Sequence, residues 1–129
     1  DACATRKNAK CERFFTKEDN ALNIKSWATH TTCSIWCNPP YGRMIGEWVE
    51  KCYTQAWEDG IDRVVMLIPS RTDTKWWHDY VSLGDVYLLK GRLKFSNAIN
   101  SVPFPSAIVD FNKFIILSQT RCVNWKYGF

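Results

Sequence analysis

The chain has 129 residues, 46% of them hydrophobic and 15% aromatic, which is enough for a packed core and excludes a disordered protein. No apolar run approaches the ~20 residues that span a membrane, and no signal peptide is visible, so we expect no membrane partner. A formal net charge of +4 suits a polyanionic partner without establishing one, and the length predicts a single domain, residues 1–129.

Residues 1–33 are the least regular part of the chain. Residues 1–5 are typical of the last turn of a strand and residues 11–15 of a short strand, with polar loops between them. Residues 21–24 suit either a helical turn or a poorly ordered connection. The first residue is Asp1 and not Met, which indicates that the chain is processed, engineered or part of a longer product.

A βαβ unit is predicted for the next part of the chain. Residues 34–37 form a short apolar run, and residues 63–68 form a longer one that is typical of a buried parallel strand. Between them, apolar residues recur at helical spacing over residues 44–58. Residues 38–42 contain two consecutive prolines, which cannot continue a strand or a helix, so we expect a rigid turn there. This turn follows the carboxyl end of a strand, where ligands bind in open α/β sheets.

The rest of the pattern predicts a helix over residues 74–81 and a strand over residues 86–89. A loop rich in Asn, Ser and Pro follows. Two further strand-like runs, residues 107–111 and 114–117, then predict a C-terminal β-hairpin.

The six cysteines predict reduced thiols in a cytoplasm rather than the disulfides of a secreted domain. Cys37 ends an apolar strand and Cys52 lies on the apolar face of the predicted helix, where a small hydrophobic side chain serves. Cys33 and Cys37 are four residues apart, with Cys3 and Cys11 upstream, which leaves zinc as an alternative. This spacing misses the paired C-x-x-C pattern, so we expect no metal.

The turn Asn38-Pro39-Pro40-Tyr41 carries groups that suit a flat substrate with an amino group. The Asn38 amide oxygen and a proline carbonyl can accept two hydrogen bonds from one exocyclic NH2 group, which makes its nitrogen more nucleophilic. Tyr41 supplies a ring on which a heterocycle can stack. For the tetrapeptide alone, a well-packed turn without chemistry is an equal alternative, because short motifs match by chance.

Several blocks of sequence extend this motif into a family resemblance. The Asn-Pro-Pro-Tyr turn resembles that of AdoMet-dependent amino-group methyltransferases, and the chain resembles phage and prophage Dam-type DNA adenine-N6 methyltransferases. The blocks that carry the resemblance keep the family's order and comprise residues 1–5, 8–11, 15–16, 19, 36–43, 68–74, 76, 78, 90–95 and 103–107. The tail, residues 112–129, matches only as a hairpin.

The resemblance implies an α/β fold, a Rossmann-like class I AdoMet-dependent methyltransferase sheet with helices on both faces, in a phage- or prophage-encoded protein of the bacterial cytoplasm. It implies that an adenine of duplex DNA is flipped into a pocket whose catalytic residues are Asn38, Pro39, Pro40 and Tyr41. The N6 amino group would attack the methyl group in line, without a covalent enzyme intermediate. Relatives usually have an N-terminal segment and a full first strand, so we expect this domain to be N-terminally incomplete.

By their position in the resemblance, the cofactor-binding candidates are Asp1, Cys3, Ala4 and Asp19. An acidic side chain near AdoMet would bond the ribose hydroxyls or the adenine amino group. The alternative for Asp19 is a solvated loop or a helix cap. No Gly-rich G-x-G loop lies near Cys3.

Six residues are candidates for contacts with DNA: Arg71, Lys75, Trp76, Lys90, Arg92 and Lys94. The last three cations alternate with apolar residues, and a period of two places them on one face of an extended segment, where they can contact phosphates. Arg71 and Lys75 suit contacts with phosphates, and Trp76 suits stacking on a base. The alternative for the three alternating cations is a solvated strand face, and the alternative for residues 71–76 is an ordinary helix with aromatic core residues.

Other functions fit the same motifs. One is a catalytically inactive, truncated relative that still binds nucleic acid. Another is an amino-group methyltransferase that acts on RNA or on a protein glutamine, although the blocks around Arg71 and Arg92 favour DNA. A secreted disulfide domain is a remote alternative. The oligomeric state cannot be deduced from these features.

Overall fold

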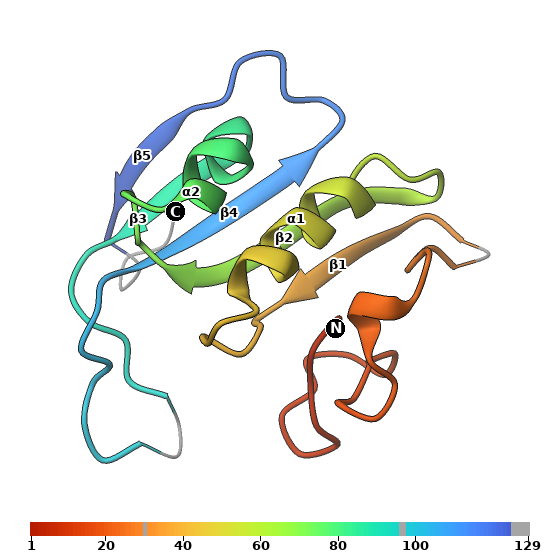
Figure 1. The fold of residues 1–129 in the computed structure, drawn as a ribbon, viewed down its shortest axis with the longest axis horizontal. Helices are drawn as coiled ribbons and strands as arrows, with labels where there is room; N and C mark the ends of the chain where they lie inside the picture. The colour runs from red at the N-terminus through yellow and green to blue at the C-terminus, as the bar shows by residue number, and fades with distance from the viewer. Residues whose placement is uncertain (30, 96–97, 125–129) are drawn as a thin grey trace.

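The computed structural model describes residues 1–29, 31–95 and 98–124. In chain order the elements are η1 (Ala21–Asn23), β1 (Cys33–Cys37), α1 (Ile45–Gln55), β2 (Ile61–Pro69), α2 (Lys75–Asp79), η2 (Val81–Leu83), β3 (Asp85–Leu89), β4 (Ser106–Asn112) and β5 (Thr120–Val123). The strands form one mixed sheet in the order β1-β2-β4-β3-β5 (Figure 1). β1 and β2 pair in parallel and α1 connects them, which confirms the predicted βαβ unit.

Four of the strands, β1, β2, β3 and β5, end at the same edge of the sheet. β4 lies between β2 and β3 and is antiparallel to both, so β1, β2 and β3 all run in one direction. The residues that follow these strands, beginning with Asn38, Ser70 and Lys90, therefore gather at one edge. We call this the carboxyl edge.

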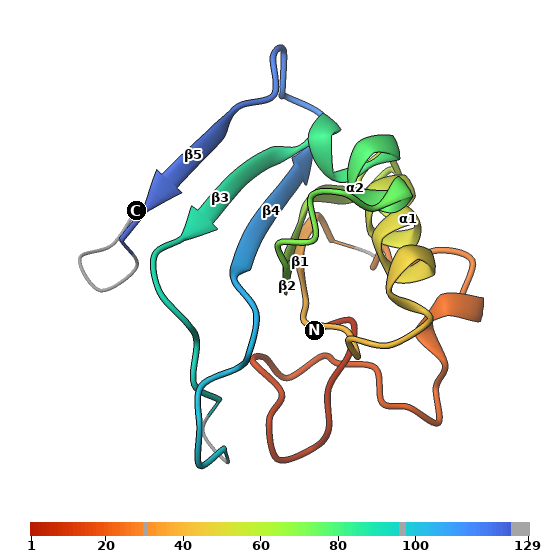
Figure 2. The same cartoon turned by 60° about the vertical axis from the view of Figure 1, so that its left-hand side comes forward.

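Both helices cover the same face of the sheet, so for the described residues the prediction of helices on both faces is wrong (Figure 2). Alternate strand residues such as Ile35, Val64 and Val109 point to the helices and are buried. Trp36 and Val65, which have the opposite parity, keep part of their surface exposed. The physical reason is that the described residues before β1 form loops and the short η1, which are too small to cover a sheet face.

The predicted C-terminal hairpin is also wrong. β4 already pairs with β2 on one side and β3 on the other, so it has no free edge for a following strand. Residues 113–119 form a loop that begins with a hydrogen bond from Phe114 N–H to Asn112 Oδ1 (3.0 Å), and β5 then pairs in parallel with β3. This loop lies at the edge opposite the carboxyl edge and leaves Phe114, Ile116 and Leu117 exposed.

The helices are shorter than predicted. After α1, the N–H groups of Trp57 and Glu58 bond carbonyls three residues back, so residues 56–58 continue as a tighter turn. α2 likewise ends at Asp79 and passes into η2. Among the described residues, neither helix has the length and apolar content needed to cross a membrane.

Residues 1–29, the N-terminal segment, start alongside β1. Ala2 N–H donates to Trp36 O (2.8 Å), although neither residues 1–5 nor residues 11–15 form the strands expected of them. The helical turn expected near residue 22 is present as η1. The segment therefore folds mostly as loops at the free edge of β1, to one side of the sheet in Figure 1.

Two side chains of α1 hold the end of the N-terminal segment. Gln55 is only 2% exposed, and its Oε1 accepts a hydrogen bond from Trp27 N–H (2.6 Å) while its Nε2 donates to Lys25 O (3.0 Å). Lys51 Nζ lies 5.8 Å from the centroid of the Trp27 ring, within cation–π range. Because the Gln55 amide is buried, these bonds fix the path of the chain before β1.

Candidate active site

The Asn38-Pro39-Pro40-Tyr41 turn begins directly after β1 and lies at the carboxyl edge, as predicted. Pro39 is buried and Pro40 exposed, and neither has an N–H, so the turn is rigid and its carbonyls remain available to other donors. Tyr41 folds back over the turn. Its hydroxyl donates to Asn38 Oδ1 (2.7 Å) and lies 3.2 Å from the carbonyl oxygen of Leu67 in β2.

Two aromatic rings from a distant part of the chain pack on Tyr41. The ring of Phe104 meets it edge-on with centroids 5.6 Å apart, and the ring of Phe95 lies at 6.4 Å. Both residues belong to the connection between β3 and β4, at the carboxyl edge. We call Tyr41, Phe95 and Phe104 the aromatic cluster. The sequence places both phenylalanines in family-like blocks, but only the strand order shows that they reach Tyr41.

The phenol and the thiol at the turn are neutral. Burial raises the pKa of the Tyr41 phenol, and the neighbouring Cys37 thiol raises it further. Cys37 is itself completely buried, which raises the pKa of its thiol. Both groups are therefore protonated at neutral pH. The turn offers hydrogen-bond acceptors and a stacking ring, but its four side chains include no ionised base or nucleophile.

The two carboxylates among the cofactor-binding candidates bond to their own loops. Asp1 Oδ1 accepts from Cys3 N–H and Asp1 Oδ2 from Lys10 N–H, each at 3.2 Å. Asp19 Oδ2 accepts from the N–H and hydroxyl of Thr16 at 2.7 and 2.8 Å, and these bonds lower the pKa of Asp19. Asp19 thus acts as a loop cap in this structure, the alternative that the sequence left open.

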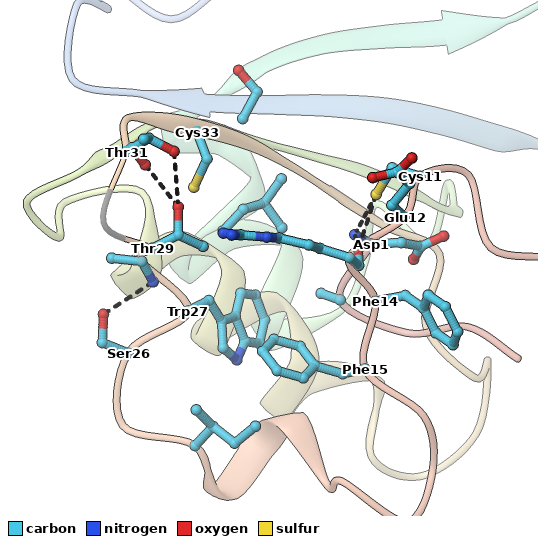
Figure 3. Close-up of a pocket in the computed structure, with 16 residues that line it drawn as sticks. Asp1, Cys11, Glu12, Phe14, Phe15, Ser26, Trp27, Thr29, Thr31 and Cys33 are labelled. Atoms are coloured by element: carbon cyan, nitrogen blue, oxygen red, sulfur yellow. Dashed lines mark hydrogen bonds between the residues drawn. The ribbon is translucent and has the colours of Figure 1, made fainter. Parts of the chain in front are cut away.

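A hollow of about 880 Å³ lies between the N-terminal segment and the free edge of β1 (Figure 3). Its lining includes the rings of Phe15 and Trp27 and the carboxylates of Asp1 and Glu12. Three of the four cofactor-binding candidates are not part of this lining: Cys3, Ala4 and Asp19. Glu12 was not predicted, and its signal in the sequence is weak because it lies in a polar loop without a motif.

The hollow runs along β1 and away from the turn. Asp1 and Ala2 form its end nearest to Asn38, because Ala2 bonds Trp36, two residues before Asn38. Its other end reaches Cys33 at the start of β1. Asn38 and Tyr41 do not line the hollow, so the two candidate sites meet only at the start of the described chain.

The cationic DNA-binding candidates are all exposed: Arg71, Lys75, Lys90, Arg92 and Lys94. Arg71 follows β2 and Lys90 follows β3, so both lie at the carboxyl edge. Lys75 pairs with Asp79 one turn further along α2. β3 ends at Leu89 and residues 91–95 form no regular strand, so the placement of the three cations on one face of an extended segment stays a prediction.

The two adjacent tryptophans of α2 differ in burial. Trp77 is 8% exposed and joins the core, whereas Trp76 is half-buried. The Trp76 ring packs against α1 at Gly46, where an added Cβ would lie 3.3 Å from it. Gly46 therefore allows α2 to approach α1 closely, and this contact holds the Trp76 ring in place.

All six cysteines are free thiols. Cys37 and Cys52 are completely buried, which confirms the placement inferred from the apolar patterns. Within the described residues, no group of three or more His, Cys, Asp or Glu side chains is placed to hold a metal ion.

The candidate active site is thus a rigid Asn-Pro-Pro-Tyr turn that contacts the rings of Phe95 and Phe104 and lies at the same edge of an α/β sheet as two exposed cations, Arg71 and Lys90. Comparison with protein families matches residues 1–115 to the family described as DNA N-6-adenine-methyltransferase (Dam). This match covers most of the chain, so the chain belongs to the Dam family.

The chain is also similar to the DNA N-6-adenine-methyltransferase of Escherichia phage T1, with 32% identity over 77 residues. Those residues are 60% of this chain and 30% of the relative, so the chain matches less than a third of that protein's length. The resemblance to phage Dam-type proteins is thereby confirmed. No solved structure matches the chain.

Proposed function

We propose that this chain methylates the N6 amino group of adenine in DNA, with AdoMet as the methyl donor. The observation that carries the proposal is the turn from Asn38 to Tyr41, which presents acceptor oxygens and an aromatic ring at the carboxyl edge. The turn lies inside the residues matched to the Dam family, which supports adenine as the target base.

The turn residues have separate roles in this proposal. Asn38 Oδ1 and a proline carbonyl accept the two N–H bonds of the adenine amino group, which draws the nitrogen lone pair out of conjugation. The Tyr41 ring stacks on the flipped base, and the two prolines fix the spacing between acceptor and ring. No protein base is needed, because the amino group can lose its proton to water after transfer. A turn without an ionised side chain suits this chemistry.

The hollow beside β1 fits AdoMet in size and in chemistry. Its volume of about 880 Å³ lies within the range of small-molecule sites. Trp27 and Phe15 would hold the adenine ring, and Asp1 and Glu12 would accept from the ribose hydroxyls. When bound, AdoMet supplies an electrophilic methyl group on a sulfonium. The other candidates, Cys3, Ala4 and Asp19, stay predictions.

DNA reaches this site from the carboxyl edge in our proposal. Arg71 and Lys90 lie at this edge, where cations can hold phosphates near a flipped adenine. A duplex hides the amino group inside the stack, so the base must leave it before transfer. We extend the proposal to a Rossmann-like methyltransferase sheet, which the parallel β1-α1-β2 unit supports, and to a cytoplasmic location.

One experiment tests the activity and the substrate class together. AdoMet is titrated into the chain by calorimetry, and methyl transfer is then measured on unmethylated duplex DNA, the same duplex with N6-methyladenine, RNA and a glutamine peptide. We expect heat of binding and transfer to the unmethylated duplex alone. Transfer to RNA or peptide instead of DNA, or AdoMet binding without any transfer, contradicts the proposal.

An inactive nucleic-acid-binding relative is the second candidate. One observation favours it: the carboxylates of Asp1 and Asp19 accept hydrogen bonds from backbone N–H groups of their own loops. This candidate predicts DNA binding that weakens with salt, together with no heat on AdoMet addition. The same calorimetric titration therefore separates the two candidates.

A further inference from the structure

We propose that the Tyr41 hydroxyl is a positioning group that sets the orientation of the Asn38 amide, so that its oxygen and not its nitrogen faces the substrate. This inference rests on the proposed function of the turn. It assigns to Tyr41 a second role, separate from stacking, that belongs to one atom of its side chain.

The need for such a group follows from the shape of asparagine. The amide oxygen and the NH2 group are nearly equal in size, and rotation by 180° exchanges them. With the oxygen forward, Asn38 accepts a hydrogen bond from an amino group. With the nitrogen forward, two donors face each other and the amino group is repelled. An asparagine that must bind an amino group therefore needs a neighbour that distinguishes its two ends.

The hydrogen-bond distances show how Tyr41 makes this distinction. The hydroxyl has one proton and two acceptors nearby, Asn38 Oδ1 at 2.7 Å and Leu67 O at 3.2 Å. The shorter distance is typical of an O–H···O bond, which spans about 2.5–3.0 Å. With the amide reversed, Asn38 Nδ2 would donate to the hydroxyl oxygen, and the hydroxyl proton would bond Leu67 O at 3.2 Å, a longer and weaker bond than the one to Oδ1. Oδ1 keeps a second lone pair for the substrate amino group.

The Tyr41 ring is itself held in place. Phe104 contacts it edge-on and Phe95 packs at a second angle, so the hydroxyl has little freedom to follow a rotating amide. The phenol is half-buried, and there a hydrogen bond is stronger than in water. Within the described residues, the bond from Tyr41 is the hydrogen bond that the structure gives to the Asn38 side chain. Its loss therefore leaves the amide without its orienting partner.

Nuclear magnetic resonance of the free chain tests the inference without cofactor or DNA. The Asn38 Nδ2H2 resonances, assigned by their loss in Asn38→Ala, are compared in the wild type, in Tyr41→Phe and in Tyr53→Phe. Tyr53 is a matched control because its ring also packs in an aromatic cluster, on α1. We expect the Asn38 amide signals to shift and broaden in Tyr41→Phe and to stay unchanged in Tyr53→Phe. Unchanged signals in Tyr41→Phe overturn the inference.

Steady-state kinetics give a second test, because a purely structural role of the Tyr41 hydroxyl would not change kcat while leaving KM unchanged. Tyr41→Phe keeps the ring, so we expect KM to stay within about twofold while kcat falls about 3- to 10-fold, the worth of one hydrogen bond. Asn38→Asp presents two equivalent oxygens and has no wrong orientation. In that background we expect Tyr41→Phe to cost less than about twofold.

The possible outcomes separate the inference from the proposed function. An equal cost of Tyr41→Phe in the wild type and in the Asn38→Asp background, or a gain in kcat, contradicts the positioning role. Absence of methyl transfer in the wild type contradicts the proposed function alone, since the amide resonances of the free chain still decide the role of the hydroxyl. If Asn38→Asp is too slow for kinetics, the amide resonances alone decide whether the Tyr41 hydroxyl has a positioning role.

Discussion

The turn after β1 and the N-terminal segment lie side by side but are held in different ways. The turn has partners from distant parts of the chain: Leu67 in β2 and Phe104 in the β3–β4 connection both contact Tyr41. Within the N-terminal segment, the polar side chains bond neighbours a few residues away, as Asp19 bonds Thr16. Its long-range ties come mainly from α1 through Gln55.

This difference shows that the two halves of the proposed site are prepared to different degrees. In the turn, the tertiary fold fixes the position of the acceptor before any substrate is present. In the N-terminal segment, the carboxylates satisfy their own loops, and AdoMet would have to share or displace those bonds. Damage to the turn should therefore affect catalysis with little effect on AdoMet, whereas damage to the segment should affect stability and AdoMet together.

The sharpest test of this contrast is Asn38→Ala, for which we expect the largest effect. Loss of the acceptor should reduce methyl transfer by ~10²–10³-fold, as for the loss of one preorganised group at a reacting centre. AdoMet affinity measured by calorimetry should be unchanged, because Asn38 does not line the hollow. A parallel loss of affinity and rate would show that the two halves are not separate.

Gln55→Met should destabilise the N-terminal segment, the other half of the proposed site. The variant keeps the length of the side chain but leaves Trp27 N–H and Lys25 O without their buried partner. We expect a loss of about 1–3 kcal/mol in the free energy of unfolding, measured by urea denaturation. Glu47→Gln on the exposed face of the same helix is the control and should change little. Equal stability of wild type and Gln55→Met would mean that α1 does not anchor the segment.

A smaller effect is expected from Phe104→Leu, which tests the support of Tyr41. Leucine keeps apolar bulk but loses the edge-on ring contact, so kcat should fall about 3- to 10-fold. Phe114→Leu provides the control, since Phe114 is exposed at the opposite edge and should leave kcat unchanged. Equal rates for the two variants would remove Phe104 from the site.

The smallest effect should come from Asp19→Ala, and it should depend on pH. The bonds from Thr16 lower the pKa of Asp19 in the folded chain, so they stabilise the fold where the carboxylate is charged. This contribution is present above the ordinary Asp pKa and is lost as the pH falls through the lowered value. Melting temperatures of wild type and variant should therefore differ slightly at pH 7 and converge once the pH falls below the lowered pKa of Asp19. A difference in melting temperature that grows as the pH falls would contradict a stabilising role of the charged Asp19 carboxylate.

Local patterns predicted the βαβ unit and the turn because their determinants lie within a few residues of one another. Helical spacing, a continuous apolar strand and two adjacent prolines each constrain the chain where they occur. The hairpin failed for the opposite reason. Residues 107–117 look like two neighbouring strands, but which strands pair depends on β2 and β3, and both edges of β4 are already occupied.

The candidate site shows the same division. Asn38 and Tyr41 were found from the tetrapeptide itself, whereas Phe104 is more than 60 residues from Tyr41 in the chain and joins it only through the strand order. Glu12 became a candidate only when the hollow was visible. Helices on both faces were expected from the family resemblance and not from periodicity, and the described residues provide helices for one face.

The central place of β4 has a consequence for how the chain folds. β2 and β3 follow one another in sequence but do not pair, because β4, made later than both, inserts between them. Until Asn112 has left the ribosome, β2 has an open, strongly apolar edge and β3 has no partner on that side. Long-range pairing of this kind is slow, and unpaired edges promote aggregation. The sheet should therefore close late, and truncation before residue 112 should yield insoluble chains rather than a smaller folded domain.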